Sequence, residues 1–335
     1  MLIAPIRRHF LAALSVAGAT GMLRTPALAA EGPPETTSVR LPDAAPGICI
    51  APEYVVADLL RAEGFTKIDR VPLPQDLNVP DLIARGMLDF GLNFASAQVA
   101  GIDRSIAMKV LAGVHVGCFE LFVHDAIRGV ADLAGKKVGI QAVGSPEHLF
   151  LSVIIANVGI DPKSQIDWVT SGPVRPKQLF IDGKIDAFLG FSPEPQELRA
   201  KGIGRVVLNS AIDRPWSQYF CCMLAGSTDY VKNHPIATKR VVRAILKAAD
   251  LCASDPARAA RMLVDGGFAP RYDYALQTLQ EVPYDKWREY NAEDTMRFYA
   301  LRLHEVGFVK SVPQKIIAEG TDWRFLDELK PELKT

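Results

Sequence analysis

The sequence predicts an α/β protein built from two similar open sheets flanked by helices, followed by a helical C-terminal segment. Short apolar runs alternate with amphipathic stretches from residue 37 to residue 208, which is typical of strands connected by helices. From Thr228 onward, nearly every stretch has helical periodicity. A segment repeated within the alternating region indicates that the two sheets are related.

The first unit is predicted between residues 37 and 114. Its helix 52–63 has Pro52 in the first turn, apolar residues at helical spacing and Gly64 after its end. The remaining elements are short apolar runs and amphipathic turns bounded by Gly, Pro and Asn. The predicted strands are 37–41, 68–71, 90–94 and 108–114, and the other helices are 80–85 and 96–102.

The second unit is predicted to begin with a strand at 137–140. Its best-marked helix covers 145–157, with Ser145 as the N-cap, Pro146 in the first turn and Glu147 near the positive end of the helix dipole. The further strands are 166–169, 187–189 and 206–208, and the further helices are 176–182 and 194–201.

Segments 82–92 and 179–189 resemble each other. Each contains the end of a helix, a glycine, an apolar residue, an aspartate and then a strand. Gly86 and Gly183 suit the left-handed conformation that ends a helix. Turns of this kind are common and can arise by convergence, but the small-residue loops at 41–47 and 140–146 repeat as well. We therefore expect a duplicated β-α-β-α-β unit.

Residues 1–30 have the three-part layout of an export signal. The pair Arg7-Arg8 precedes an apolar run that is too short to span a membrane, and small residues surround Ala29-Ala30, where we expect cleavage. The order Arg-Arg-x-Phe-Leu resembles a twin-arginine (Tat) signal, with a Sec signal or a disordered tail as the alternatives. The mature protein is predicted to be soluble in a bacterial periplasm.

Composition excludes several classes of partner. The chain has 38 basic and 38 acidic residues, and removal of residues 1–30 takes away three arginines and no acid. A near-neutral chain of this kind predicts no nucleic-acid partner and no binding to an anionic membrane. The remaining length, roughly 300 residues, allows two lobes with sizeable cores.

The cysteine pattern predicts neither a disulfide framework nor a metal centre. The odd count leaves at least one thiol free. His115-x-x-Cys118 hints at a metal site, but such a site needs three or four ligands, and the sequence has no Cys-x-x-Cys or His-Glu-x-x-His. We therefore expect buried, inert thiols and no metal or cofactor. The cysteines are Cys49, Cys118, Cys221, Cys222 and Cys252.

Several of these segments carry a resemblance to a known family. They are residues 83–90, the run Asp-Leu-Ala-Gly-Lys-Lys-Val-Gly at 132–139, Gly-Ile-Asp-Pro at 159–162, residues 182–187 and Pro-Glu-Pro at 193–195. The chain resembles periplasmic solute-binding proteins of ABC transporters, in the nitrate/sulfonate/taurine (SsuA-like) and NMT1/THI5-like group. The resemblance covers about residues 37–265 and says little about the ligand. It departs from the family at Phe191, where a Trp is usual.

The resemblance implies a two-lobed type II periplasmic binding protein fold. Lobe 1 would comprise 31–122 and 225–335, lobe 2 would comprise 123–224, and the hinge would lie near 122–126 and 220–226. A ligand would close the lobes by hinge motion, and an ABC permease in the inner membrane would receive the solute from the closed form. We expect the protein to act as a monomer.

Ligands of open α/β sheets bind beyond the carboxyl ends of the strands, so the candidate contacts are in the loops there. Aromatic residues could stack on a planar solute, and His115 and Gln218 could give directed hydrogen bonds, although each could equally be core. Few cations occur in these loops, Arg175 and Arg214 being exceptions, which favours a neutral or amine-bearing solute; helix N-termini could still hold an anion. The predicted ligand-binding residues are Asp43, Gly47, Cys49, Asn93, Phe94, Ser96, His115, Cys118, Gln141, Gly144, Ser145, Phe191, Glu194, Trp216, Gln218 and Tyr219.

Catalytic motifs are sparse. The sequence has no Gly-x-Gly-x-x-Gly, Gly-x-Ser-x-Gly or Ser-x-x-Lys, and the phosphate-loop-like run 129–137 precedes a strand instead of a helix. We therefore predict a binding protein and no catalytic residues. Two alternatives stay open, because fold does not decide function. One is an enzyme on the same fold, of the THI5 pyrimidine-synthesis or menaquinone-pathway type, and the other is a ligand-sensing periplasmic subunit of a signalling receptor.

Overall fold

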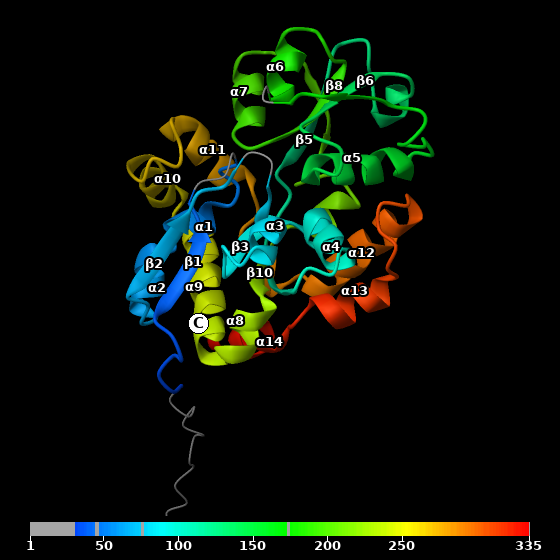
Figure 1. The fold of residues 1–335 in the computed structure, drawn as a ribbon. Coiled ribbons are helices and arrows are strands. Elements are labelled where there is room, and N and C mark those ends of the chain that lie inside the picture. Colours follow the sequence, from blue (N-terminus) through cyan, green and yellow to red (C-terminus); the bar gives the residue numbers. More distant parts are fainter. Residues whose placement is uncertain (1–30, 44–46, 75–76, 173–174, 335) are drawn as a thin grey trace, which may run out of the picture. The chain divides into compact units, whose positions relative to one another are not determined.

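The strands form one five-stranded sheet and a second group of strands, as the alternating sequence predicts (Figure 1). The computed structural model describes residues 31–43, 47–74, 77–172 and 175–334. The predicted export signal at 1–30 lies outside the described residues. The α/β class with helices flanking the sheets is confirmed.

The five-stranded sheet has the order β7-β6-β8-β5-β9. β6 pairs in parallel with β7 and β8, whereas β5 runs antiparallel to β8 and β9. Phe122, Phe180, Phe188 and Leu198 form a separate apolar cluster that packs α6 and α7 on this sheet. The elements are β5 (Phe119–Val123), β6 (Lys137–Ile140), α5 (Pro146–Asn157), β7 (Asp167–Thr170), α6 (Pro176–Ile181), β8 (Ala187–Phe191), α7 (Glu194–Ala200) and β9 (Arg205–Asn209), with a 3-10 turn at Val130–Leu133.

The second group contains the parallel pair β1-β2 and the antiparallel sheet β3-β10-β4. The predicted helix 52–63 is divided at Val56 into two short helices. The elements are β1 (Ser38–Pro42), α1 (Ala51–Val55), α2 (Ala57–Ala62), β2 (Lys67–Val71), α3 (Val79–Ala84), β3 (Phe90–Phe94), α4 (Ala95–Asp103), β4 (Met108–Val116) and β10 (Phe220–Ser227).

The repeated sequence segments have the same geometry in both groups. The Asp89 amide donates to the Arg40 carbonyl at 3.0 Å, and the Arg40 amide donates to Asp89 Oδ2 at 2.8 Å. In the five-stranded sheet, Asp186 and Lys137 exchange the same two bonds, both at 2.8 Å. The glycines three residues earlier both have positive φ, +66° at Gly86 and +67° at Gly183. Each aspartate thus ties the first strand of its unit to the third, which places β1 beside β3 and gives the order β2-β1-β3-β10-β4.

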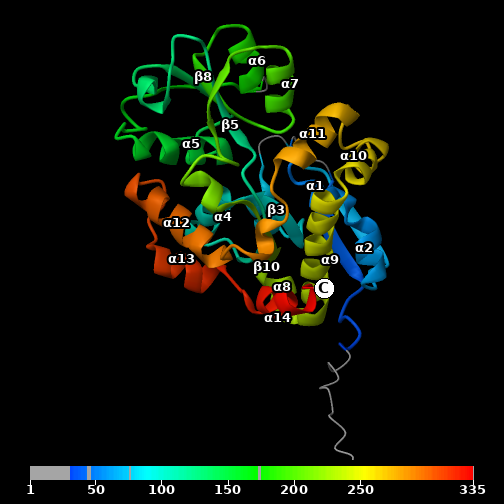
Figure 2. The same cartoon turned by 180° about the vertical axis from the view of Figure 1, so that it is seen from behind.

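The C-terminal part is helical, as predicted. Figure 2 shows α9 running beside α1 and α2, and contacts join these helices. Within the described residues, no helix is both long enough and apolar enough to cross a membrane. The helices are α8 (Thr228–Asn233), α9 (Pro235–Ser254), α10 (Pro256–Asp265), α11 (Tyr272–Glu281), α12 (Ala292–Glu305), α13 (Pro313–Gly320) and α14 (Arg324–Glu332), with 3-10 turns at Trp216–Gln218 and Lys286–Arg288.

Two strands were not expected from the sequence, and both bear on the hinge. β10 covers the predicted hinge segment 220–226, and β5 ends inside the other segment, 122–126, so the chain passes between the two groups of strands earlier, at 117–118 and at 210–219. These two crossings lie against each other. The Ser210 hydroxyl accepts from the Phe119 amide at 2.9 Å and from the Cys118 amide at 3.2 Å.

An ion network around the buried Glu120 joins the five-stranded sheet to the C-terminal helices. Arg199 of α7 donates to Glu120 of β5 and, with bonds of 2.7 and 2.6 Å, to Glu281 of α11. Burial raises the pKa of Glu120, and Arg199 opposes that effect. Gln196 also donates to Glu281, at 2.8 Å. Because Glu120 is only 4% exposed, Arg199 is the group that compensates its buried charge.

Replacing Arg199 by alanine is expected to lower the free energy of unfolding by about 2–4 kcal/mol, because the buried Glu120 loses its counter-ion. Glu281→Gln should cost far less, since Glu281 is more than a third exposed and Arg199 keeps Glu120 as its partner. Urea unfolding of the variants measures this difference, with the exposed Lys201→Ala as the control. Equal losses for Arg199→Ala and Lys201→Ala would contradict the assignment.

Candidate functional site

A cavity of about 640 Å³ lies where the strands of both groups end. One wall comes from residues that follow β1, including Gly47 and Cys49, and from the end of β3, including Asn93. The opposite wall comes from residues that follow β6 and β8, including Gln141 and Glu194. The carboxyl ends of strands in two related units therefore face one space, and its volume suits a small organic molecule.

The structure brings together just over half of the predicted ligand-binding residues. Their contact with a ligand stays a prediction, but their position at the cavity agrees with the expectation that strand-end loops form the site. Those lining the cavity are Gly47, Cys49, Asn93, Phe94, Gln141, Gly144, Ser145, Phe191 and Glu194.

The other predicted residues do not line the cavity that the described residues form. Asp43 is exposed after β1, and Gln218 is exposed in the second crossing. Ser96 is buried in α4, where its hydroxyl donates to the Pro146 carbonyl at 3.3 Å. His115 and Cys118 lie in a buried cluster described below.

Trp216 and Tyr219 are used in packing and do not line the cavity. Trp216 is 4% exposed and meets Phe150 of α5 and Phe298 of α12 edge-on. Tyr219 stacks on Phe298, with ring centroids 3.9 Å apart. The sequence placed this segment at the cleft because it follows β9, but α12, which comes much later in the chain, covers these rings.

The apolar part of the cavity wall is aromatic. Phe94 ends β3 and Phe191 ends β8, so the two residues hold equivalent positions in the repeated units. Their ring centroids are 5.8 Å apart, and Phe119 packs against both rings. The Arg175 guanidinium lies 5.0 Å from the Phe191 centroid. These faces suit a planar or apolar part of a solute.

The N-terminus of α5 is filled by groups of the chain itself. Glu147 Oε1 accepts from the Gln141 amide at 3.0 Å and from the Ser145 hydroxyl at 2.7 Å. Ser145 holds the N-cap position as predicted, but its side chain makes no cap bond to the backbone. The Gly144 amide donates to His148 Nδ1 at 2.9 Å, and burial lowers the pKa of His148 to about 4. The donors of the loop that leads into this helix are therefore used within the chain, and the Glu147 carboxylate lies at the end of the helix where an anion would bind.

The charges of the cavity wall are mostly acidic. Both cations in the wall are paired, Arg175 with Glu194 at 2.8 Å and Arg104 with Asp81 at 2.9 Å. An anionic solute would have to compete with these pairs for a guanidinium. The acids in the wall are Glu53, Asp81, Asp103, Glu147 and Glu194, and the cations are Arg104 and Arg175.

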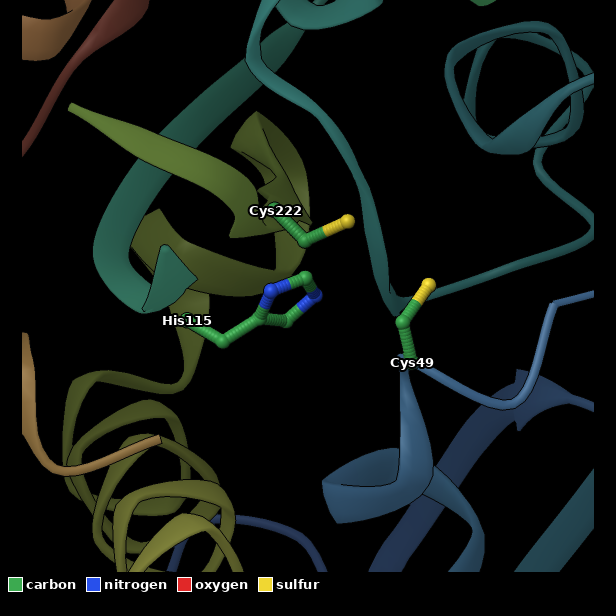
Figure 3. A group of neighbouring side chains, drawn as sticks. All are labelled: Cys49, His115 and Cys222. Atoms are coloured by element: carbon green, nitrogen blue, oxygen red, sulfur yellow. The ribbon is translucent and has the colours of Figure 1, made fainter. Parts of the chain in front are cut away.

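A cluster of thiols surrounds His115 at the edge of the cavity (Figure 3). Figure 3 shows the Cys49 and Cys222 sulfurs pointing toward the same space as one nitrogen of the His115 ring. The possible ligand atoms of Cys49, His115 and Cys222 lie within 4.8 Å of one another, as do those of His115, Cys118 and Cys221. His115 Nδ1 lies 3.0 Å from the Gly117 carbonyl, and its Nε2 is buried without a partner among the described residues.

The cluster has the donor set of a thiophilic metal site. Sulfur and imidazole ligands suit zinc or copper(I), and a carbonyl on the second ring nitrogen is the usual support for a histidine ligand. The sequence predicted inert thiols because His115-x-x-Cys118 offers only two ligands and no complete metal-binding motif is present. The structure confirms their burial and adds their proximity: Cys118 Sγ and Cys221 Sγ are 3.2 Å apart. Burial raises the pKa of Cys221 and Cys222.

Sequence comparison places this chain in a family. The NMT1-like family model matches residues 50–264, which is more than half of the chain. The chain belongs to the NMT1-like family. Among curated relatives, this NMT1-like chain is 26% identical over 251 residues to the 4-amino-5-hydroxymethyl-2-methylpyrimidine phosphate synthase THI12 of Saccharomyces cerevisiae, covering 68% of this chain and 71% of that protein. The resemblance predicted from the sequence is thus confirmed.

Solved structures show the same fold for this NMT1-like chain. The periplasmic nitrate-binding protein NrtA from Synechocystis PCC 6803 superposes with a TM-score of 0.76 and 14% identity, over 90% of each chain. The periplasmic aliphatic sulphonate binding protein SsuA from Escherichia coli superposes with a TM-score of 0.70 and 18% identity, over 86% of this chain and 92% of that one. The desulfurization enzyme DSZB superposes with a TM-score of 0.57 and 14% identity, over 88% of this chain and 99% of that one. The two-lobed periplasmic binding protein fold is confirmed, and at these identities the likeness concerns the fold alone.

Many residues that line the cavity were not among the predicted contacts, and Glu53 and Phe308 are two of them. Glu53 interrupts the apolar run 50–56, and this charge in a buried helix was a signal that the sequence did offer. Phe308, by contrast, follows α12, and nothing near it in the sequence marks it as cavity wall.

Proposed function

We propose that this protein is a periplasmic solute-binding protein that delivers a small molecule to an ABC importer. The observation that carries the proposal is the cavity between the strand ends of the two related units, with its paired aromatic rings Phe94 and Phe191. The periplasmic location is supported by the predicted signal at 1–30 and by the fold of the neighbours. The protein would act as a monomer and pass its solute to an inner-membrane permease.

The solute would be neutral or amine-bearing. The acids of the cavity outnumber its cations, and each cation is already paired. We place the two crossings between the lobes at 117–118 and 210–219, where the chain leaves one group of strands and enters the other. Motion about these crossings would open the cavity and admit the solute.

Binding with closure is tested by a thermal-shift screen of small amines and uncharged polar metabolites, followed by small-angle X-ray scattering. A compound that binds only the native state raises its stability, and closure would reduce the radius of gyration. Phe94→Ala should reduce the thermal shift, whereas Tyr272→Ala, outside the cavity wall, should not. A bound compound that leaves the scattering curve unchanged would contradict closure.

A second candidate is an enzyme on this fold. The observation in its favour is that curated relatives at 24–26% identity are named phosphate synthases. The two candidates differ in what happens to a bound compound. Release of the compound unchanged, as seen by mass spectrometry, supports a binding protein, whereas release of a changed compound supports an enzyme.

A further inference from the structure

We propose that Glu53 selects the solute by holding a basic nitrogen, of an amine, amidine or nitrogen heterocycle, at the wall of the cavity. This inference rests on the proposed solute-binding function and names the chemical class that the site accepts. Two observations carry it. Glu53 Oε2 has no hydrogen-bond partner among the described residues, and the neighbouring arginines are bonded to other groups.

The first carboxyl oxygen of Glu53 has a fixed structural role. Glu53 lies in α1 and is fully buried, and its Oε1 accepts from the Leu92 amide of β3 at 2.9 Å. β1 meets β3 through Asp89, and further along β3 the Leu92 amide bonds to the side chain of Glu53 instead of to a neighbouring strand. This bond fixes the carboxyl group at β3, and Glu53 is one of the residues that line the cavity.

The second oxygen, Oε2, has no such role. It is buried and has no hydrogen-bond partner in the part of the chain that the structure describes. Among the residues that line the cavity, Glu53 alone has such an atom within the described ranges. Leaving a buried polar atom unpaired costs about 1–3 kcal/mol, so it points to a partner that arrives with a ligand.

The nearest cation does not supply that partner. Arg70 of β2 faces α1, but its guanidinium donates to the backbone carbonyls of Pro42 at 3.0 Å, Glu53 at 3.0 Å and Tyr54 at 3.4 Å. The charge of Arg70 favours the ionised form of Glu53, and Asp43 in turn interacts with Arg70.

The remaining charged groups of the cavity wall are also engaged. Arg104 is paired with Asp81, and Arg175 is paired with Glu194. Asp103 accepts from the amides of Lys310 and Ser311. Glu53 is therefore the acid of the wall that holds a buried oxygen with no partner among the described residues.

A basic nitrogen can bind Glu53 Oε2 whether the nitrogen arrives unprotonated or as a cation. Burial raises the pKa of Glu53 to about 8, so near neutral pH the carboxyl group is largely protonated and can donate to an unprotonated ring nitrogen. A solute that arrives as a cation instead displaces that proton to solvent and forms an ion pair with the carboxylate. In the first case the proton stays between acid and base, and in the second one proton is released for each solute bound.

The test uses probes of one shape and different charge: benzamidine, uncharged benzamide and anionic benzoate, with 4-aminopyridine as a heterocyclic base. Thermal shift and calorimetry with the mature protein should show binding of the two bases and not of benzoate. Glu53→Gln should weaken the bases about tenfold or more, the usual value of a hydrogen bond to a charged group, and leave benzamide unchanged. Calorimetry in two buffers should show proton release with benzamidine near pH 7 that is lost in Glu53→Gln.

The matched control is Glu120→Gln, which changes another buried glutamate with an unpartnered Oε2, outside the cavity wall. It should bind the bases as the unmodified protein does. Equal binding of benzamidine by the unmodified protein and by a folded Glu53→Gln variant, or tighter binding of benzoate, would overturn the role of Glu53 and leave the solute-binding function standing. A failure of all four probes to bind would count against both.

Discussion

Replacing Gly117 by alanine is expected to lower the free energy of unfolding by about 3 kcal/mol or more. Gly117 has a φ of +56°, a conformation that L side chains rarely adopt. A Cβ there would also lie under 3.0 Å from the Cα and N atoms of Ala211, which are backbone atoms that cannot turn aside. Strain and overlap therefore add, and the overlap falls where the two crossings between the strand groups touch.

The control for this prediction is Gly183→Ala. Gly183 has a similar φ of +67°, but nothing lies within 4 Å of a Cβ built on it. Only the strain of the positive φ remains at Gly183, and the expected loss in the free energy of unfolding is about 1 kcal/mol. Urea unfolding of both variants separates the two effects. If Gly117→Ala loses no more stability than Gly183→Ala, then the segments at 117–118 and 210–219 can move apart at no cost in free energy, which would contradict the prediction.

Glu53→Gln is expected to stabilise the protein at high pH and to leave its stability unchanged at low pH. In the unfolded chain the Glu53 carboxyl titrates near 4.5, whereas in the folded protein burial raises its pKa to about 8. Between these values the folded state holds a proton that the unfolded state has lost. Stability therefore falls as the pH rises through this range, by up to about 1.4 kcal/mol per pH unit, and glutamine removes that dependence.

The difference between the two proteins should thus be near zero at pH 4.5 and grow to about 3–5 kcal/mol at pH 8.5 in favour of Glu53→Gln. Unfolding midpoints measured across this range give the difference directly. Glu197→Gln serves as a control of opposite sign, because Lys177 and Lys201 lower the pKa of Glu197, which makes its charged form stabilising. Parallel curves for Glu53→Gln and the unmodified protein would show that Glu53 is not buried as an acid.

The sequence predicted elements that have marked ends, and it missed two strands whose ends carry no such signal. Strand 90–94 follows the glycine-aspartate turn at 86–89, and helix 145–157 begins with Ser145 and Pro146, so both are close to the observed β3 and α5 although both are buried along most of their length. β10 lies between β3 and β4 and is buried along nearly all of its length, so its sequence shows no alternation. In β5 the buried Glu120 broke the apolar pattern, since its partner Arg199 is remote in sequence.

The site was predictable to the extent that strand ends define it. The carboxyl ends of β3, β6 and β8 reach the cavity because the topology brings them together, so the sequence predicted Phe94, Gln141 and Phe191 at the site. Tyr219 was misplaced because Phe298, which covers it, comes much later in the chain. Glu53 is harder to predict, because an acid in the first turn of a helix is usually a solvated partner of the helix dipole and here it is buried.

The packing of Trp216 gives this protein a native optical reporter. The indole lies in the second crossing and is 4% exposed, between Phe150 of α5 and Phe298 of α12. Its emission wavelength and quenching depend on that apolar enclosure. Any displacement of the five-stranded sheet relative to the C-terminal helices changes the enclosure, so a variant in which the other three tryptophans, Trp168, Trp287 and Trp323, are replaced by phenylalanine would report the motion by fluorescence with no attached dye.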